Sequence, residues 1–507
     1  MLPSPSPTRP STPLDDGQEQ RPLKRRRANS YDKPPPPPPP PASVPVTTTS
    51  STTSTATSTI TSSPPNTPYH HPIQPPLDPH NAPPCRPIAF QQPLHLTSFS
   101  YSPTRRVLLT PHDRDASLAV YSSPSLGSDL NTGFEQAVWR DDRCDEGLDA
   151  LLDTLQHYVE ADTTGAAAEM LDKVNIITWR GMITKLLLAV YQVQEAHTDA
   201  THSKRTRAEG WEMNVMLMAG TLYFEESKTP SHLSSKAASE KSYLRQSYYG
   251  YSFEAFSTRS PQSQSHPSHT KIPFAPPNTN VQWCSIVKTN LGGFRMFLGG
   301  EVDCLRAGWR EGDPIRTDDF VELKTNIVIG SHRDETLFER QKLLKHYTQS
   351  FLLGVPTIIV GFRTRAGHLT ALQSFKTLEI PRLVRHKPHA WSPTTSLASA
   401  FDLIQFINTT LLYDEHNKAA EDRWKETGEI PENGWPVWRL KFRPLEERER
   451  EGGVGGGGGG RGGLELVRLT EGEVEDEVKA GKKRVERVGF LLNTWVEGLR
   501  ERRRRKG

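Results

Sequence analysis

The sequence lacks several features that would place it in a familiar class. Its four cysteines include no C-x-x-C pair, which argues against a zinc site or a disulfide scaffold and indicates reduced thiols inside the cell. No apolar run reaches the roughly 18 residues of a membrane-spanning helix, so we expect no membrane partner. The N-terminus has no apolar core of a secretory signal. A formal net charge of only +3 does not by itself indicate a nucleic-acid binder.

Apolar residues are also scarce, at 34% of the chain, but the shortage is local. Of the 43 prolines, 26 lie in the first 100 residues, beside long Ser/Thr tracts. Such a segment cannot bury enough apolar surface to offset the entropy of ordering it. We therefore predict a disordered arm over residues 1–90. The roughly 400 residues that follow are enough for one large domain.

Composition also divides the rest of the chain. Residues 91–445 have a globular pattern, and 446–464 contain a glycine run that predicts a flexible surface insertion. Residues 465–499 carry apolar side chains around Trp495 and are expected to return to the fold. The last segment, 500–507, is expected to be a solvated basic tail.

A short basic cluster, Lys24 to Arg27, lies within the N-terminal arm. Basic residues in an accessible arm suit a nuclear import signal, although a chance cluster of charge in a polar tail would look the same. We accordingly expect the protein in the nucleus.

Hydrophobic periodicity predicts a helix that carries a candidate anion-binding residue. Apolar residues recur at helical spacing from Ile183 to Tyr191, and Thr178 is placed to cap the helix. Arg180 then lies in the first turn, where free backbone N–H groups and the helix dipole favour an anion.

A second helix is predicted from Gln341 to Leu353, ended by Gly354. Its polar face is shared by Lys342, by Lys345 or His346, and by Gln349. The apolar run Val355 to Val360 that follows reads as a buried strand. Because strands and helices intermix, the fold class is α/β or mixed α+β.

Carboxylates concentrate in two strand-like segments. Alternate residues of a strand share a face, so Glu301 and Asp303 project together, as do Glu322 and Lys324. If these strands pair as a hairpin, three carboxylates and a lysine converge, which requires a counter-charge. Hard oxygen ligands of this charge suit Mg²⁺ or Mn²⁺, and the lysine would stabilise a phosphate or orient water. This Asp…Glu-x-Lys layout is that of many metal-dependent nucleases, while a solvated hairpin face with ordinary ion pairs is the alternative.

These segments and three others resemble, in order, the DXO family of RNA 5′-end decapping nucleases. The chain looks most like the fungal members that partner the nuclear 5′–3′ exoribonuclease. The similar motifs are Trp179-Arg180-Gly181, Gly250 to Glu254, Glu301-Val302-Asp303, Glu322-Leu323-Lys324 and Lys342 to Gln349. The resemblance implies one decapping nuclease domain over residues 91–445, with two β-sheets flanked by helices.

The resemblance also implies roles for individual residues. Two divalent ions would be bound by side chains and one backbone carbonyl, from Glu254, Glu301, Asp303, Glu322 and Leu323. Lys324 and Gln349 would contact the scissile phosphate and the water, and Glu301 would also contact substrate. Further substrate-binding residues would be Arg105, Glu146, Trp179, Arg180, Gly181 and Cys284, although a buried cysteine is more often a core residue.

The activity implied is metal-dependent hydrolysis at RNA 5′ ends. It would remove NAD caps and unmethylated guanosine caps and convert 5′-triphosphates to monophosphates, with an exoribonuclease as protein partner. Two alternatives stay open from the sequence: a mainly non-catalytic protein that stabilises the exoribonuclease, and a DNA-cleaving nuclease of the same Asp…Glu-x-Lys layout.

Overall fold

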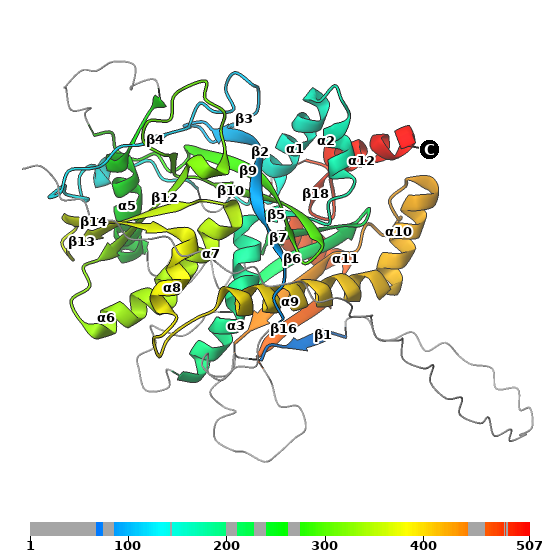
Figure 1. The fold of residues 1–507 in the computed structure, drawn as a ribbon. Helices are drawn as coiled ribbons and strands as arrows, with labels where there is room; N and C mark the ends of the chain where they lie inside the picture. Colours follow the sequence, from blue (N-terminus) through cyan, green and yellow to red (C-terminus); the bar gives the residue numbers. More distant parts are fainter. Residues whose placement is uncertain are drawn as a thin grey trace, which may run out of the picture. The chain divides into compact units, whose positions relative to one another are not determined.

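Two mixed β-sheets with helices packed around them form the fold, as Figure 1 shows for a computed structural model. The structure describes residues 67–74, 86–141, 144–198, 210–227, 240–261, 274–444, 462–480, 482 and 485–506. All of these belong to one unit, residues 63–507. The predicted import signal at Lys24 to Arg27 and most of the glycine-rich insertion lie outside the described residues.

The larger sheet has ten strands and contains both parallel and antiparallel pairs. In spatial order its strands are β1 (Tyr69–Pro72), β16 (Gly463–Arg468), β15 (Trp438–Arg443), β6 (Trp211–Met218), β7 (Thr221–Glu226), β5 (Ile176–Trp179), β10 (Phe294–Glu301), β9 (Gln282–Leu291), β2 (Phe90–Tyr101) and β3 (Val107–Leu108).

The second sheet has six strands: β14 (Leu369–Lys376), β13 (Thr357–Arg363), β12 (Phe320–Ile327), β11 (Cys304–Leu305), β4 (Val120–Tyr121) and β8 (Thr258–Arg259). A small ribbon pairs β17 (Arg487–Val488) with β18 (Leu491–Leu492). The chain passes from the larger sheet to the smaller one directly after Glu301, because β10 ends there and β11 begins at Cys304.

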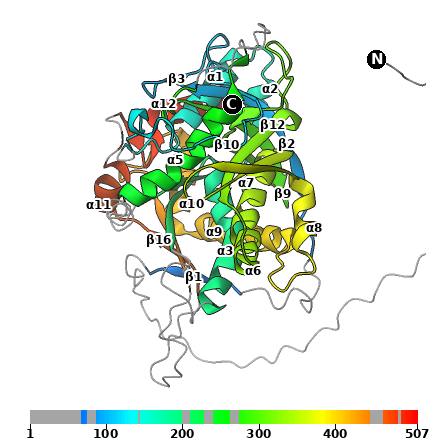
Figure 2. The ribbon, with the colours of Figure 1, turned by 90° about the vertical axis from the view of Figure 1, so that its left-hand side faces the viewer.

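The helices pack on the faces of these sheets. They are α1 (Asp149–Ala161), α2 (Ala166–Leu171), α3 (Arg180–Thr198), α5 (Glu240–Ser257), α6 (His332–Leu337), α7 (Leu344–Leu353), α8 (Ile380–Val384), α9 (Pro393–Tyr413), α10 (Glu415–Thr427), α11 (Glu471–Glu473) and α12 (Asn493–Lys506). The long helix α3 packs against both α9 and α7 (Figure 2). No helix in the described part of the chain is both long enough and apolar enough to cross a membrane.

The continuous apolar run in β13 has a clear structural reason. Ile358 and Val360 enter a core cluster with residues of α7, whereas Ile359 enters another cluster with residues of α5. Both faces of the strand are therefore covered, which favours apolar residues at every position. The strand predicted at 355–360 is confirmed, shifted by two residues at its start and three at its end.

The second predicted helix is also present, with one irregularity. Residues Phe338–Leu343 form a π-helical segment that continues directly into α7. Gly354 ends the helix with a φ of 74°, the left-handed conformation that glycine adopts without strain. Lys345 and Gln349 are four residues apart in α7 and so lie on the same side of the helix, which is the expected polar face.

Both ends of the described chain differ from expectation. Strand β1 lies inside the range predicted as a disordered arm, and it pairs with β16. Residues 500–506 were expected to be a solvated tail but continue helix α12. Arg502 is only 7% exposed and lies over the Trp495 ring, so part of this basic run is built into the fold.

The prediction of a mixed α+β domain with two principal sheets is confirmed. Three of the four cysteines are described, and all three carry free thiols: Cys144, which is exposed, and Cys284 and Cys304, which are buried.

Candidate active site

The first carboxylate pair lies at the junction of the two sheets. Glu301 is the last residue of β10, Val302 is buried, and Asp303 lies in the two-residue connection to β11. Gly300 precedes them, and a side chain there would come within 2.6 Å of Leu353 on α7. Glycine therefore lets α7 pack closely behind the end of β10.

The second pair lies on β12, and the predicted hairpin is wrong. Strand β12 pairs with β13 and β11, whereas β10 belongs to the other sheet. The pairs still meet, because the chain crosses between the sheets at Asp303. The Asp303 Oδ2 accepts a 2.6 Å hydrogen bond from the Leu323 backbone N–H, and the Lys324 ammonium lies 3.5 Å from the same oxygen.

Glu322 and Lys324 share one face of β12, as their spacing predicts. Lys324 Nζ lies 2.7 Å from Glu322 Oε1, and the Glu322 side chain is only 2% exposed. Lys324 also donates a 3.0 Å hydrogen bond to the Leu323 carbonyl oxygen. This carbonyl, which the resemblance implies as a metal ligand, therefore contacts the same ammonium group as Glu322 and Asp303.

Glu254 approaches from helix α5, which packs on β12. The preceding Phe253 is fully buried, and a side chain at Gly361 would clash with its ring at 2.5 Å, so glycine permits the close packing. Burial raises the pKa of Glu254, and the nearby Asp303 and Glu301 raise it further. The fourth carboxylate thus joins the cluster through tertiary packing of a helix on a strand.

Arg180 is the second cation that contacts the cluster. Its Nη1 lies 3.3 Å from Glu322 Oε2, and its side chain is 14% exposed. It begins α3, as predicted, but Thr178 does not cap this helix. Thr178 lies in β5, fully buried, and its hydroxyl donates to the Phe224 carbonyl oxygen on the neighbouring strand at 2.7 Å.

The residues on either side of Arg180 have different surroundings. The Trp179 indole N–H donates to the Gly147 carbonyl oxygen at 2.8 Å, and its ring packs against Gly299 of β10. Gly181 lies in the first turn of α3, where an added Cβ would meet open space. Substrate-binding roles for both residues stay predictions.

The polar face of α7 is turned toward the cluster. The pKa of the Lys345 ammonium is lowered by desolvation and by the positive charges of Lys324, Lys185 and Arg180. Gln349 lies one turn further along the same face and is partly buried. His346, the alternative to Lys345 on the predicted polar face, has both ring nitrogens buried without a hydrogen-bond partner within the described residues, and burial lowers its pKa to about 3.

The other predicted substrate-binding residues lie toward β9. Cys284 is opposite Glu301 in the β9–β10 register, and it packs in a small core cluster with Phe99 and Tyr101. Burial raises the pKa of its thiol. Arg105 and Glu146 form a bidentate ion pair with two contacts of 2.8 Å. Two strand positions before Cys284, Gln282 joins this pair to Glu301, a role that alternation along β9 could have suggested.

The carboxylates of the cluster differ in their tendency to ionise. Burial raises the pKa of Asp303 to about 7, against the opposing charge of Lys324. Burial also raises the pKa of Glu301, again against Lys324 and Arg180. Burial acts on Glu322 in the same direction, but Lys324 and Arg180 outweigh it and lower its pKa to about 2. The two cations therefore stabilise mainly one carboxylate.

This difference gives a testable pH dependence for the metal-free protein. Folded Asp303 keeps its proton to about pH 7, whereas an unfolded aspartate loses it near pH 4. Because the folded state binds the extra proton, its stability falls as the pH rises from about 4 to 7. Glu322 acts in a different window, since its depressed pKa removes stability only as the pH falls below about 4.

With EDTA present, thermal unfolding from pH 5 to 8 should show Asp303→Asn gaining stability relative to wild type as the pH rises. Asp318→Asn, at an exposed position in the turn just before β12, is the matched control and should follow wild type throughout. A constant difference between Asp303→Asn and wild type would contradict the raised pKa.

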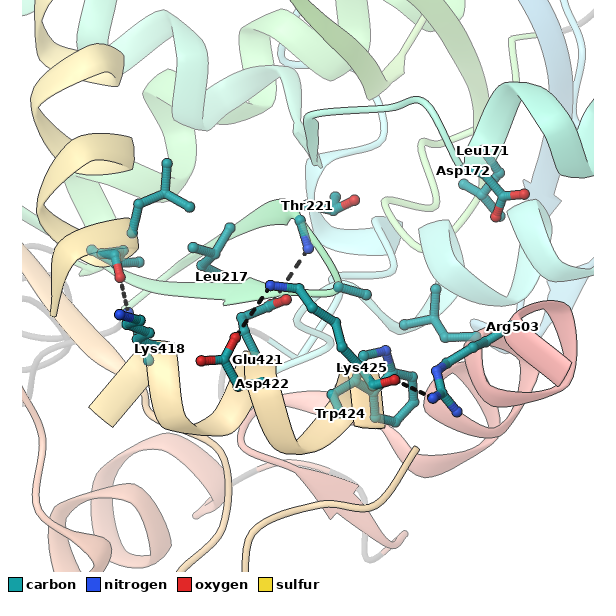
Figure 3. Close-up of a pocket in the computed structure, with 16 residues that line it drawn as sticks. Leu171, Asp172, Leu217, Thr221, Lys418, Glu421, Asp422, Trp424, Lys425 and Arg503 are labelled. Carbon is teal, nitrogen blue, oxygen red and sulfur yellow. Dashed lines mark hydrogen bonds and ion pairs between the residues drawn. The ribbon is translucent and has the colours of Figure 1, made fainter. Parts of the chain in front are cut away.

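A separate cavity of about 470 Å³ is lined by other residues (Figure 3). Its lining comes largely from α10 and from the turn between β6 and β7, with Arg503 contributed by α12. Acidic and basic side chains alternate along it, as with Glu421 and Lys425, and it shares no residue with the predicted site. The carboxylate cluster is therefore the better candidate for chemistry.

Comparison with known proteins assigns the family. Residues 91–452 match the model of the RAI1-like PD-(D/E)XK nuclease family. The chain belongs to this family. The matched range contains every predicted site residue, from Arg105 to Gln349.

Individual relatives agree with membership of the RAI1-like family. The decapping nuclease RAI1 of Cryptococcus neoformans is 34% identical over 402 residues, which cover 76% of this chain and 96% of that protein. Candida albicans Rai1, crystallised with pU5-Mn²⁺, matches with a TM-score of 0.62 and 22% identity over 86% of this chain and 100% of that one. Scheffersomyces stipitis Rai1, crystallised with (3′-NADP)⁺ and calcium ion, matches with a TM-score of 0.58 and 20% identity over 85% and 99%.

The donor set fits a divalent cation, as expected for this nuclease family. Four carboxylates, Glu254, Glu301, Asp303 and Glu322, influence one another's ionisation. Among the described residues, the cations in contact with this cluster are Arg180, at Glu322, and Lys324, at Glu322 and Asp303. If all four are ionised, the cluster carries two negative charges more than positive ones. In the described part of the chain no three His, Cys, Asp or Glu side chains are arranged so that they could hold a metal ion as they stand. In this arrangement Lys324 serves as the counter-ion to Glu322 and Asp303.

Proposed function

We propose that this protein is a metal-dependent hydrolase that removes caps from RNA 5′ ends. The observation that carries the proposal is the convergence of four carboxylates and Lys324 at the junction of the two sheets. The names of the relatives, decapping nuclease RAI1 in particular, support the choice of RNA caps as substrate.

The carboxylates would hold the metal, with Glu254, Glu301, Asp303 and Glu322 as side-chain ligands and the Leu323 carbonyl as a further one. We propose Mg²⁺ or Mn²⁺ in two positions, since the ligands are hard oxygens and pU5-Mn²⁺ is bound by the Candida albicans relative. When bound, such ions polarise a phosphoryl oxygen and make a bound water more acidic.

The basic and amide side chains would act on the substrate. Lys324 is paired with Asp303 and Glu322 in the metal-free protein. When a divalent cation neutralises these carboxylates, the Lys324 ammonium can contact a phosphate oxygen instead. Gln349, on the adjacent face of α7, would orient the attacking water. Arg180, at the start of α3, would bind phosphate together with the free N–H groups of the first turn.

The proposed substrates are NAD-capped RNA, RNA with unmethylated guanosine caps, and 5′-triphosphate RNA, each left with a 5′-monophosphate. Binding of (3′-NADP)⁺ by the Scheffersomyces relative supports the NAD-capped class. NAD is then a part of the substrate and not a redox cofactor.

A product assay tests the proposal. With Mn²⁺, the protein should release intact NAD from NAD-capped RNA and leave a 5′-monophosphate end, and EDTA should abolish both products. Unmethylated-cap, triphosphate and monophosphate RNAs belong in the same assay, beside duplex DNA. Cleavage of monophosphate RNA alone would indicate an exonuclease, and cleavage of DNA alone would favour the general Asp…Glu-x-Lys nuclease.

The nuclear location and an exoribonuclease partner are proposed on the resemblance of the motifs. A purely non-catalytic role as the stabilising partner is disfavoured, because a scaffold has no physical need for four clustered carboxylates. Co-purification of a nuclear 5′–3′ exoribonuclease with wild type and with Asp303→Asn would separate the two roles. Equal recovery of the exoribonuclease with both proteins would mean that its binding does not depend on catalysis.

A further inference from the structure

Arg105 is held on several sides by groups of the protein itself. Its Nε and Nη2 donate to the two oxygens of Glu146, both at 2.8 Å, and its Nη1 donates to the Asn280 carbonyl oxygen at 2.9 Å. The guanidinium also lies 3.4 Å from the centre of the Tyr101 ring. With a side-chain exposure of 14%, it has little freedom to reach another ligand.

Gln282 connects this clamp to the carboxylate cluster. Its Oε1 accepts a 2.6 Å hydrogen bond from Arg105 Nη1, and its Nε2 donates a 2.8 Å bond to Glu301 Oε2. Because a guanidinium can only donate, Arg105 determines which end of the Gln282 amide faces Glu301. One oxygen of Glu301 is thereby held by a neutral donor, while its second oxygen has no hydrogen bond within the described residues.

The cavity beside the pair does not suit a phosphate. It measures about 520 Å³ and is lined by Arg105 together with acidic side chains, among them Glu146, Asp153 and Glu486. Among the described residues of this lining Arg105 is the only basic one, and its charge is matched by Glu146, which also lies 3.9 Å from Arg140. An RNA phosphate at Arg105 would have to displace Glu146 and approach other carboxylates.

We propose that Glu146, Arg105 and Gln282 form a positioning relay that fixes the carboxylate of Glu301 for metal binding. Arg105 then acts on Glu301 through Gln282. The inference rests on the proposed function and adds a positioning role for two residues that the resemblance implies as substrate-binding.

The relay matters because a metal ligand must be held in one orientation before the ion arrives. Groups that hydrogen-bond a metal ligand from behind typically contribute about 10- to 100-fold in metal affinity. A residue that binds only RNA contributes nothing to metal affinity when RNA is absent. Metal binding without RNA therefore separates the two roles of Arg105.

The experiment measures Mn²⁺ binding to the full-length protein by isothermal titration calorimetry, without RNA. Gln282→Met keeps the length of the side chain but removes both hydrogen bonds, and it should weaken Mn²⁺ binding about 10- to 100-fold. Arg105→Lys keeps a charge that could bind phosphate but cannot span Glu146 and Gln282, so it should weaken Mn²⁺ binding as well. Gln373→Met and Arg106→Lys, at exposed positions, are the controls and should bind as wild type does.

The combined variant adds a second criterion. Because the two residues act in series, Arg105→Lys with Gln282→Met should bind Mn²⁺ about as weakly as Gln282→Met alone. Thermal unfolding in EDTA identifies any variant that fails to fold, and Arg105→Lys decides the question if Gln282→Met does not fold. Wild-type affinity in folded Arg105→Lys, with only a raised KM for capped RNA, would overturn the relay. Absence of Mn²⁺ binding to wild type would instead overturn the proposed function.

Discussion

Replacing Asp303 with asparagine is expected to reduce hydrolysis of capped RNA by at least about a thousand-fold, or ~4 kcal/mol in the barrier. Asp303 lies at the centre of the cluster, because its Oδ2 meets both the Leu323 backbone N–H and the Lys324 ammonium. An amide keeps the shape but loses the charge that a divalent ion requires. The measurement is the single-turnover rate on NAD-capped RNA at saturating Mn²⁺.

The same substitution should not unfold the protein. Removing one of several buried like charges relieves repulsion, so thermal stability in EDTA at pH 7.5 should equal or exceed that of wild type. Asp318→Asn is again the control and should retain full activity. If Asp303→Asn stays folded and cleaves at the wild-type rate, the assignment of the catalytic centre is wrong.

Replacing Lys324 with methionine is expected to lower kcat about 100- to 1,000-fold, the typical cost of losing one donor to a developing negative charge. Metal binding should respond in the opposite way. Lys324 is the counter-ion to Glu322 and Asp303 in the metal-free protein, so its removal takes away a cation that competes with the metal. Mn²⁺ affinity without RNA should therefore stay at least as high as in wild type.

Stability provides a further check on Lys324. With Arg180 as the one remaining cation that contacts the four carboxylates among the described residues, the metal-free variant should unfold at a lower temperature than wild type, and Mn²⁺ should restore much of the difference. Lys376→Met, on the exposed face of β14, should change neither property. Loss of Mn²⁺ binding together with activity would mean that Lys324 only supports the structure of the site.

Local rules were enough to predict which residues share a face. Alternation along a strand correctly placed Glu322 with Lys324, and helical spacing placed Lys345 with Gln349 on one side of α7. The end of that helix at Gly354 followed from the conformational freedom of glycine. Each of these depends on residues a few positions apart, where covalent geometry leaves few choices.

Long-range packing could not be predicted in the same way. The hairpin was wrong because β10 and β12 lie in different sheets, a fact that depends on every other strand pairing. The prediction that Thr178 caps the helix was wrong because β7 runs beside β5, and the Thr178 hydroxyl donates to the Phe224 carbonyl oxygen of β7. The family resemblance supplied Glu254, whose neighbours in sequence say nothing of a metal, but it gave no indication of Gln282.

The two-residue crossing between the sheets makes the proposed catalytic centre depend on how the two sheets pack against each other. The proposed metal ligands come from the end of a strand in one sheet, from a strand in the other and from a helix that covers the second sheet, so no single part supplies all of them. A substitution far from the centre that shifts one sheet against the other by half an ångström would leave every strand intact and still spoil coordination. Catalytic loss without unfolding is therefore the expected mark of damage along this seam, even where no ligand is touched.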